Sequence, residues 1–153
     1  MSEARRRWYL RAAADFWRQA IALQSDRCLE SDDRGDVRSR ADIEFFAVAV
    51  HRLLRVAEQA RDRISASEPI RDAIAAFEQR WPSVREVRNY SEHLTGPRPR
   101  GQMPNWYSHD SIWKGLAGGR VEYLIHARDM QPDIDQLYEA LCDFLGEVPE
   151  DAE

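Results

Sequence analysis

The 153-residue sequence has few cysteines and very little lysine. Its two cysteines, Cys28 and Cys142, form no CxxC pair and have no histidine at ligand spacing, so the sequence does not predict a zinc site. We expect both to be reduced thiols in the core or near the surface. Lys114 is the one lysine among 22 basic residues, and the others are arginines, which bind phosphate bidentately. The arginines therefore allow a local anion-binding site, although the net charge of −5 argues against nonspecific coating of nucleic acid.

Long apolar runs are also missing. FFAVAV, at 45–50, is among the longest, far below the roughly 18 residues that a membrane span requires. The N-terminal RRRWYLRAAADFW lacks the continuous apolar block of a secretory signal. Its arginines and amphipathic spacing are compatible with an organelle transit peptide, but an ordinary first helix is the favoured interpretation. We therefore expect a cytoplasmic protein with no membrane partner.

The motifs of common cofactor sites are absent. No glycine-rich phosphate loop joins a strand to a helix, and no Glu-x-x-His supports a di-iron bundle. Ser108, His109 and Asp110 are adjacent in sequence and point in different directions, so they cannot form a catalytic triad. Metal-binding helical spacing is also absent from the four histidines, His51, His93, His109 and His126. The sequence predicts neither a metal nor a cofactor.

Most of the chain has the periodicity of amphipathic helices. Apolar residues recur at three- and four-residue spacing over roughly 4–30, 40–64, 68–81, 84–96 and 132–146. Amphipathic helices with short connections predict an all-α fold, an antiparallel bundle of four to five helices. We expect a single helical-bundle domain over 1–147 and an acidic tail over 148–153.

The helical period is interrupted before the last helix. GPRPRGQMPNW, at 96–106, is punctuated by proline and glycine and is read as a loop. The following SIWKGLAGGRVEYLIHA predicts a β-hairpin with its turn at Ala117–Gly119. The predicted insertion covers about 106–127 and places Val121, Tyr123 and Ile125 on one face of its second strand.

The spacing also predicts which side chains face the core. In the first helix the apolar stripe is Tyr9, Ala13, Phe16, Ala20 and Leu23, widened by Trp17 and Ile21. In the later helices the inward residues are Ile43, Phe46, Val50, Leu53, Ala57, Ile64, Ile70, Ile74, Phe77, Ile134, Leu137, Leu141 and Leu145. Expected helix starts are Ser39 or Asp42, Ser67, Ser83 with Glu86 as a capping box, and Pro132.

The segment VREVRNYSEHLTG, at 84–96, combines a core face with a polar face. At about 100° per residue, the core face is Val84, Val87, Tyr90 and Leu94. By the same arithmetic Arg88 lies about 100°, Asn89 about 200° and His93 about 240° from Val87, so His93 is not a core histidine. An ordinary account exists, in which Arg88 pairs with Glu92 and His93 benefits from the helix dipole. The spacing by itself does not decide between this ordinary polar face and a catalytic set of Arg88, Asn89 and His93.

Arg88-Asn89-Tyr90-Ser91-Glu92-His93, near the end of a late helix in a helical bundle, resembles the HEPN superfamily. The signature of that superfamily is an arginine, four to six residues, and a histidine, often with a polar residue directly after the arginine. The resemblance covers the helical part of the chain, roughly 1–96 and 132–146. Members are commonly metal-independent ribonucleases, often toxins or defence proteins, whose site forms where two motif helices meet across a homodimer. Others have lost activity and serve as binding or assembly modules.

The resemblance implies a role for each motif residue. His93 would be the acid/base group, Arg88 the phosphate clamp, and Asn89 a support for the imidazole or the substrate. The loop after the motif would bind single-stranded RNA through arginines on phosphates and rings on bases, with Arg98, Arg100, Trp106 and Tyr107. The alternative for Trp106 and Tyr107 is that they only anchor the loop and hairpin.

The resemblance also implies partners, namely RNA, a second copy of the chain, and a protein partner or antitoxin. Thr95 occupies the position, two residues after the histidine, where many toxin members carry a modifiable tyrosine, so regulation by that modification is not expected. The runner-up function is a catalytically inactive HEPN-like module for protein–protein interaction. A small-molecule or nucleotide-binding bundle is a third possibility.

Overall fold

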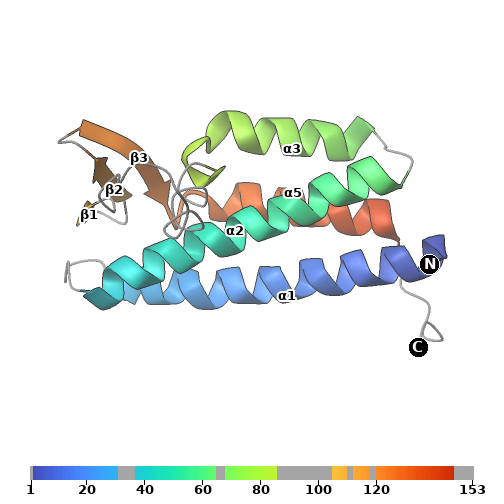
Figure 1. The fold of residues 1–153 in the computed structure, drawn as a ribbon, viewed down its shortest axis with the longest axis horizontal. Helices are drawn as coiled ribbons and strands as arrows, with labels where there is room; N and C mark the ends of the chain where they lie inside the picture. Colours follow the sequence, from blue (N-terminus) through green and yellow to red (C-terminus); the bar gives the residue numbers. More distant parts are fainter. Residues whose placement is uncertain are drawn as a thin grey trace, which may run out of the picture.

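We describe a computed structural model of the chain (Figure 1). The structure describes residues 2–30, 37–64, 68–85, 105–109, 112–117 and 120–146. Within these ranges, the side chains of 37–40, 63, 105–109, 112–117 and 120–123 lie outside the description.

The described part of the chain is mostly helical, which confirms the predicted all-α class. The elements, in chain order, are α1 Glu3–Glu30, α2 Val37–Arg63, α3 Glu68–Arg80, β1 Asn105–His109, β2 Ile112–Ala117, β3 Arg120–His126 and α5 Gln131–Leu145. α1 and α2 lie side by side along most of their length, and α5 packs against α1, α2 and α3. None of the described helices has both the length and the apolar character of a membrane span.

The three strands form one antiparallel sheet in the order β1-β2-β3. β2 pairs with β3 from Ile112↔His126 to Ala117↔Arg120, with an irregularity between Gly115 and Leu116. β1 was not predicted, and the loop assigned to 96–106 is wrong for Asn105 and Trp106, which pair with β2. Proline and glycine dominate the start of that segment, so its local composition outweighs the strand signal at its end.

The predicted core faces of the later helices are confirmed. Buried side chains are Ile43, Phe46, Val50, Leu53, Ala57 and Ile64 from the α2 segment, Ile70, Ile74 and Phe77 from α3, and Ile134, Leu137, Leu141 and Leu145 from α5. α3 and α5 each bury one apolar face, and α2 buries a wider arc that also includes Ala47, Leu54 and Val56, so all the predicted residues fall within the buried surface.

The predicted core stripe of α1 is partly wrong, although Ala13, Trp17 and Ala20 are half-buried and pack against the core. Its buried residues are instead Leu10, Ala14, Ile21, Ser25 and Cys28. Tyr9, Phe16 and Leu23 are exposed. Ile21, which was expected only to widen the stripe, is its one fully buried member.

Polar contacts with α5 set the rotation of α1. The Arg7 guanidinium donates to the carbonyl oxygens of Phe144 (2.8 Å) and Leu145 (3.3 Å), at the C-terminal end of α5 where helical carbonyls have no partners within the helix. Farther along α1, Arg18 pairs with Asp135. These contacts direct the Arg7–Arg18 face toward α5 and turn Phe16 away from the core.

The predictions of where the helices start are partly confirmed. α2 already begins at Val37, so Ser39 and Asp42 lie inside the helix and neither caps it. Ser67 lies outside the described residues. Pro132 is in the first turn of α5, as predicted. Gly146 ends α5 with φ of 74°, a left-handed conformation that glycine adopts without strain.

Candidate functional site

The predicted catalytic set falls outside the described residues. Arg88, Asn89 and His93 lie there, as do Arg98 and Arg100. The structure places the backbone of the other two predicted contacts in β1, where the pairs are Trp106↔Gly115 and Tyr107↔Lys114. The functional roles of all seven residues stay predictions.

The turn that leads into the motif is described and is held in the fold. Residues 83–85 are helical, and Val84 is buried, as predicted for the core face of this segment. Ser83 accepts a hydrogen bond from the backbone N–H of Leu124 on β3, with 3.0 Å between Oγ and N; Glu86, its predicted partner in a capping box, lies outside the described residues. The start of the motif segment is therefore tied to the sheet by a contact that local sequence does not encode.

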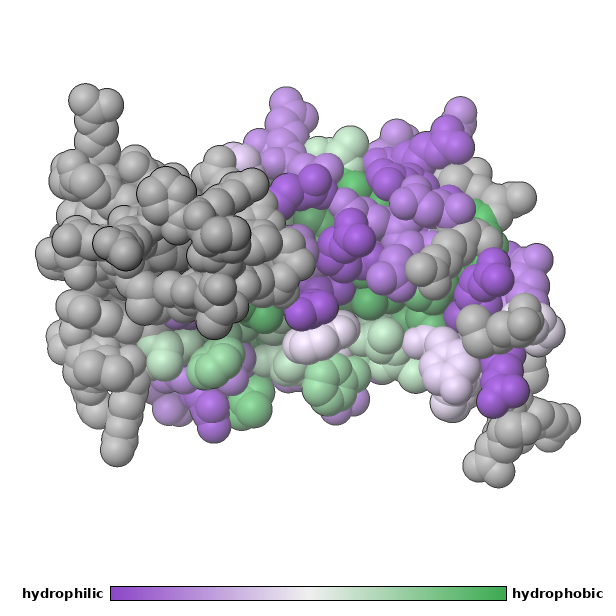
Figure 2. All heavy atoms as spheres, viewed as in Figure 1, coloured by the Kyte–Doolittle hydropathy of each residue, from purple (hydrophilic) through white to green (hydrophobic). Residues whose placement is uncertain are grey.

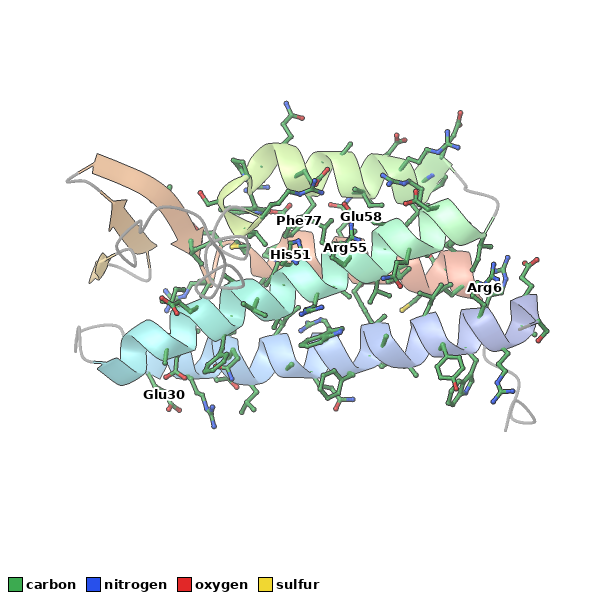
Figure 3. All side chains as sticks on the ribbon, viewed as in Figure 1. Arg6, Glu30, His51, Arg55, Glu58 and Phe77 are labelled. Carbon is green, nitrogen blue, oxygen red and sulfur yellow. The ribbon has the colours of Figure 1, made fainter. Side chains whose placement is uncertain are left out.

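A buried carboxylate on α2 ties the same turn to the helices. Glu58 is 6% exposed and accepts hydrogen bonds from two arginines, Arg55 one turn earlier on α2 and Arg85 in the described turn, the latter at 2.6 Å. Arg85 also pairs with Glu78 of α3. Figure 3 shows Arg55 and Glu58 extending from α2 on the side of α3. Because its charge is compensated, the carboxylate is tolerated in the core.

The end of α3 is held against the start of α5. The indole N–H of Trp81 donates to Asp133 at 2.7 Å, and Arg80 pairs with the same carboxylate at 3.2 Å. The Trp81 ring also contacts the ring of His126, with centroids 5.6 Å apart, and His126 is paired with Asp129 at 3.3 Å. Residues 80–85 are thus held by contacts with α2, α3, β3 and α5 up to the last described residue, Arg85.

A second polar cluster joins α1 to α5. Asp15 accepts hydrogen bonds from the Tyr138 hydroxyl (2.6 Å) and from Arg11 Nε (3.1 Å). The hydrogen bond to Asp15, together with burial, raises the pKa of Tyr138. Burial also raises the pKa of the neighbouring Cys142 thiol. A thiol with a raised pKa is a poor nucleophile, so this cluster holds the two helices together and offers no activated group.

Cys28 is buried, Cys142 is half-buried, and both are reduced, as expected from the sequence. Over the side chains that the structure describes, no three histidine, cysteine, aspartate or glutamate residues gather closely enough to hold a metal ion.

The exposed face of α1 is the other candidate site. Tyr9, Phe16 and Leu23 are 48%, 61% and 54% exposed, and Ala13 and Ala20 beside them are half-buried at the edge of the core. We call these five residues the outer stripe. Figure 2 shows apolar side chains along the lower side of the molecule, over α1. Single exposed apolar residues are ordinary, but a regular row of large ones on a helix is typical of a binding surface.

The outer stripe and the buried face of α1 differ in the regularity of their spacing. The outer stripe alternates steps of four and three residues without exception, a period of 3.5, whereas the buried face is less regular. A strict 3.5 repeat is characteristic of pairing between helices rather than of packing onto a globular core.

Comparison of the chain with protein-family models, with curated protein sequences and with solved structures finds no match.

Proposed function

We propose that the chain is a HEPN-like, metal-independent endoribonuclease that cleaves cytoplasmic RNA. The observation that supports it is the place of the motif in the chain: Arg88 lies three residues after Arg85, the last described residue of a turn that is bound to α2, α3 and β3. Catalytic groups must be held within about 0.5 Å of a productive geometry, which requires such a support. The fold implied is an antiparallel helical bundle with the sheet inserted before α5.

The proposed reaction needs only side-chain chemistry. His93 removes the proton of a ribose 2′-hydroxyl, whose oxygen then attacks the adjacent phosphorus. The bond from phosphorus to the 5′-oxygen breaks, His93 returns the proton to that oxygen as it leaves, and the other fragment ends in a 2′,3′-cyclic phosphate. Arg88 binds the phosphate and stabilises the charge that develops on it, and Asn89 orients the imidazole.

The substrate would extend over the residues after the motif. Arg98 and Arg100 would bind flanking phosphates, and Trp106 and Tyr107 would stack on unpaired bases. Because Arg88 and His93 lie about 140° apart around one helix, the proposed site is shared across a homodimer, with the arginine of one protomer beside the histidine of the other.

The test is cleavage of a mixed single-stranded RNA in EDTA by proteins of matched folding and oligomeric state. His93→Ala and Arg88→Ala should each lower the rate by at least about 100-fold, since acid–base catalysis contributes about 10²–10⁴. Arg71→Ala, which removes an exposed arginine from α3, is the matched control and should cleave like the wild type. Equal cleavage by wild type and His93→Ala would refute the assignment.

A mixing experiment tests the shared site. Arg88→Ala and His93→Ala protomers, each inactive alone, should recover part of the activity when mixed, because one of the two composite sites then keeps both native groups. If no activity returns although mixed dimers form, the site lies within one protomer.

A second candidate, a catalytically inactive HEPN-like module for protein–protein interaction, is favoured by the outer stripe. Such a module needs an exposed apolar surface and no histidine. Absence of RNA cleavage by the wild type, on substrates of varied sequence and with a candidate protein partner present, would favour this function over the ribonuclease.

A further inference from the structure

The spacing of the outer stripe continues to both ends of α1. Extended by the same alternating steps, the row reads Arg6, Tyr9, Ala13, Phe16, Ala20, Leu23, Arg27 and Glu30. It covers about 36 Å of helix at 1.5 Å per residue. Arg6 and Glu30 lie at opposite ends of α1 in Figure 3. The row therefore has the spacing of a coiled-coil seam; its large residues are exposed, whereas Ala13 and Ala20 are half-buried and also touch the core.

We propose that this row pairs with the same row of a second copy of the chain, with the two α1 helices antiparallel about a two-fold axis. This contact on α1 is separate from the contact between motif helices that the shared catalytic site requires, and it is tested without RNA.

The first argument is the alternation of large and small side chains. Large residues, Tyr9, Phe16 and Leu23, alternate with Ala13 and Ala20. In an antiparallel pair, the three- and four-residue steps of one row align with those of the other row only in certain registers. Each of these registers places a large residue opposite a small one. In the register that spans the whole row, Phe16 packs on the partner's Ala20 and Leu23 on the partner's Ala13. Alternating sizes of this kind let two helices approach closely and interdigitate.

The second argument is the charge at the two ends of the row. In the same register Arg6 meets the partner's Glu30, and the two-fold axis repeats the pair at the other end. Arg27 falls over the ring of the partner's Tyr9, where a guanidinium is attracted to the aromatic face. Parallel pairing would instead set Arg6, Arg27 and Glu30 each against its own copy, which is repulsive. The charges therefore select the antiparallel arrangement.

The third argument is area. The three large side chains are about half exposed, and an aromatic side chain buries about 150–250 Å² when fully covered, so each copy exposes about 300 Å² here. The large side chains of the two copies account for about half of the buried surface, and the polar side chains that flank about 36 Å of helix supply the rest. The total surface buried in the dimer is then near 1,200 Å², the lower limit of specific interfaces. We therefore expect a reversible dimer with a dissociation constant on the order of 1–100 µM.

The dimer is tested by sedimentation of the full chain over a concentration series. Leu23→Gln should weaken association at least about tenfold, because it places an amide against the partner's Ala13 at two symmetric positions. Leu124→Gln is the matched control, since Leu124 is an exposed leucine of β3 outside the row, and it should leave association unchanged. Circular dichroism and unfolding curves verify that both variants are folded. A wild type that is still monomeric at about 500 µM, well above the expected dissociation constant, or equal weakening by both variants, overturns the proposal.

Orientation and register are tested by exchanging the end charges. Glu30→Arg alone sets like charges at both ends and should weaken the dimer severalfold. Arg6→Glu together with Glu30→Arg restores opposite charges in the antiparallel register and should recover the loss. A double variant as weak as the single one overturns the antiparallel register. A ribonuclease that is active as a monomer would refute the shared catalytic site without bearing on this pairing.

Discussion

Replacement of the arginines around Glu58 should show strong non-additivity. Glu58 is buried, whereas the side chains of Arg55 and Arg85 are 54% and 49% exposed. Each arginine is therefore partly screened by solvent, and removing one as Arg→Met should lower the free energy of unfolding by only about 1 kcal/mol. After either single replacement the carboxylate keeps one cation.

Removing both arginines has a larger effect. The buried Glu58 carboxylate then loses both of its hydrogen-bonded cations, and an uncompensated buried charge destabilises by about 3–5 kcal/mol. The double variant should thus lose about 1–3 kcal/mol more than the two single losses added together. In a Glu58→Gln background no charge is stranded, so the excess should disappear.

The assay is urea unfolding at pH 7 of the wild type, both single variants and the double variant, in the Glu58 and Gln backgrounds. Additivity within about 0.5 kcal/mol would refute the reasoning, because it would mean that solvent already reaches the carboxylate. Hydrogen exchange on the same proteins reports on the support of the motif: amides of 83–85 should lose protection in Arg85→Met and less so in Arg55→Met, which leaves that turn bound to Glu58.

Other predictions concern the core and the α1–α5 cluster. Phe46→Ala should lower the free energy of unfolding by about 3–5 kcal/mol, whereas Phe45→Ala, at a residue 60% exposed, should lower it by less than about 1 kcal/mol; urea unfolding compares the two neighbours directly. Tyr138→Phe should remove about 1 kcal/mol at neutral pH by deleting the hydrogen bond to Asp15. Because the folded pKa of Tyr138 is raised, the native state keeps this proton while the unfolded state loses it above about pH 10. Unfolding of the wild type should therefore become easier with rising pH more steeply than that of Tyr138→Phe, and parallel curves would contradict the assignment. Cys142 should react with iodoacetamide near neutral pH more slowly in the native protein than in urea, since burial raises its pKa; equal rates would show an accessible thiolate.

The two faces of α1 show why amphipathic spacing alone can mislead. Tyr9, Phe16 and Leu23 form the more regular stripe, and hydrophobic patterning assigns such a stripe to the core. Leu10, Ala14 and Ile21 are nevertheless the buried residues of this helix, which packs against α2 and α5. The choice between the faces depends on contacts such as that of Arg7 with the end of α5, whose partners are distant in sequence.

The contacts that hold the turn before the motif could not be predicted from local sequence either. The predicted capping box of Ser83 and Glu86 is local, whereas the hydrogen bond that the Ser83 hydroxyl accepts from the Leu124 N–H spans 41 residues and has no local signal. In the sequence, Glu58 is not distinguished from the other charged residues of α2. Its role in holding the turn before the motif comes from the hydrogen bond with Arg85, which lies 27 residues later.

The sequence by itself determined the helical class, the approximate extents of the described helices, the inward faces of α2, α3 and α5, and the RNxxxH motif. These depend on local periodicity and composition, which act within a few residues. Tertiary structure alone decided which face of α1 is buried, that β1 joins the sheet, and which side chains hold residues 80–85. Those outcomes depend on surfaces brought together from distant parts of the chain, and no local pattern carries that information.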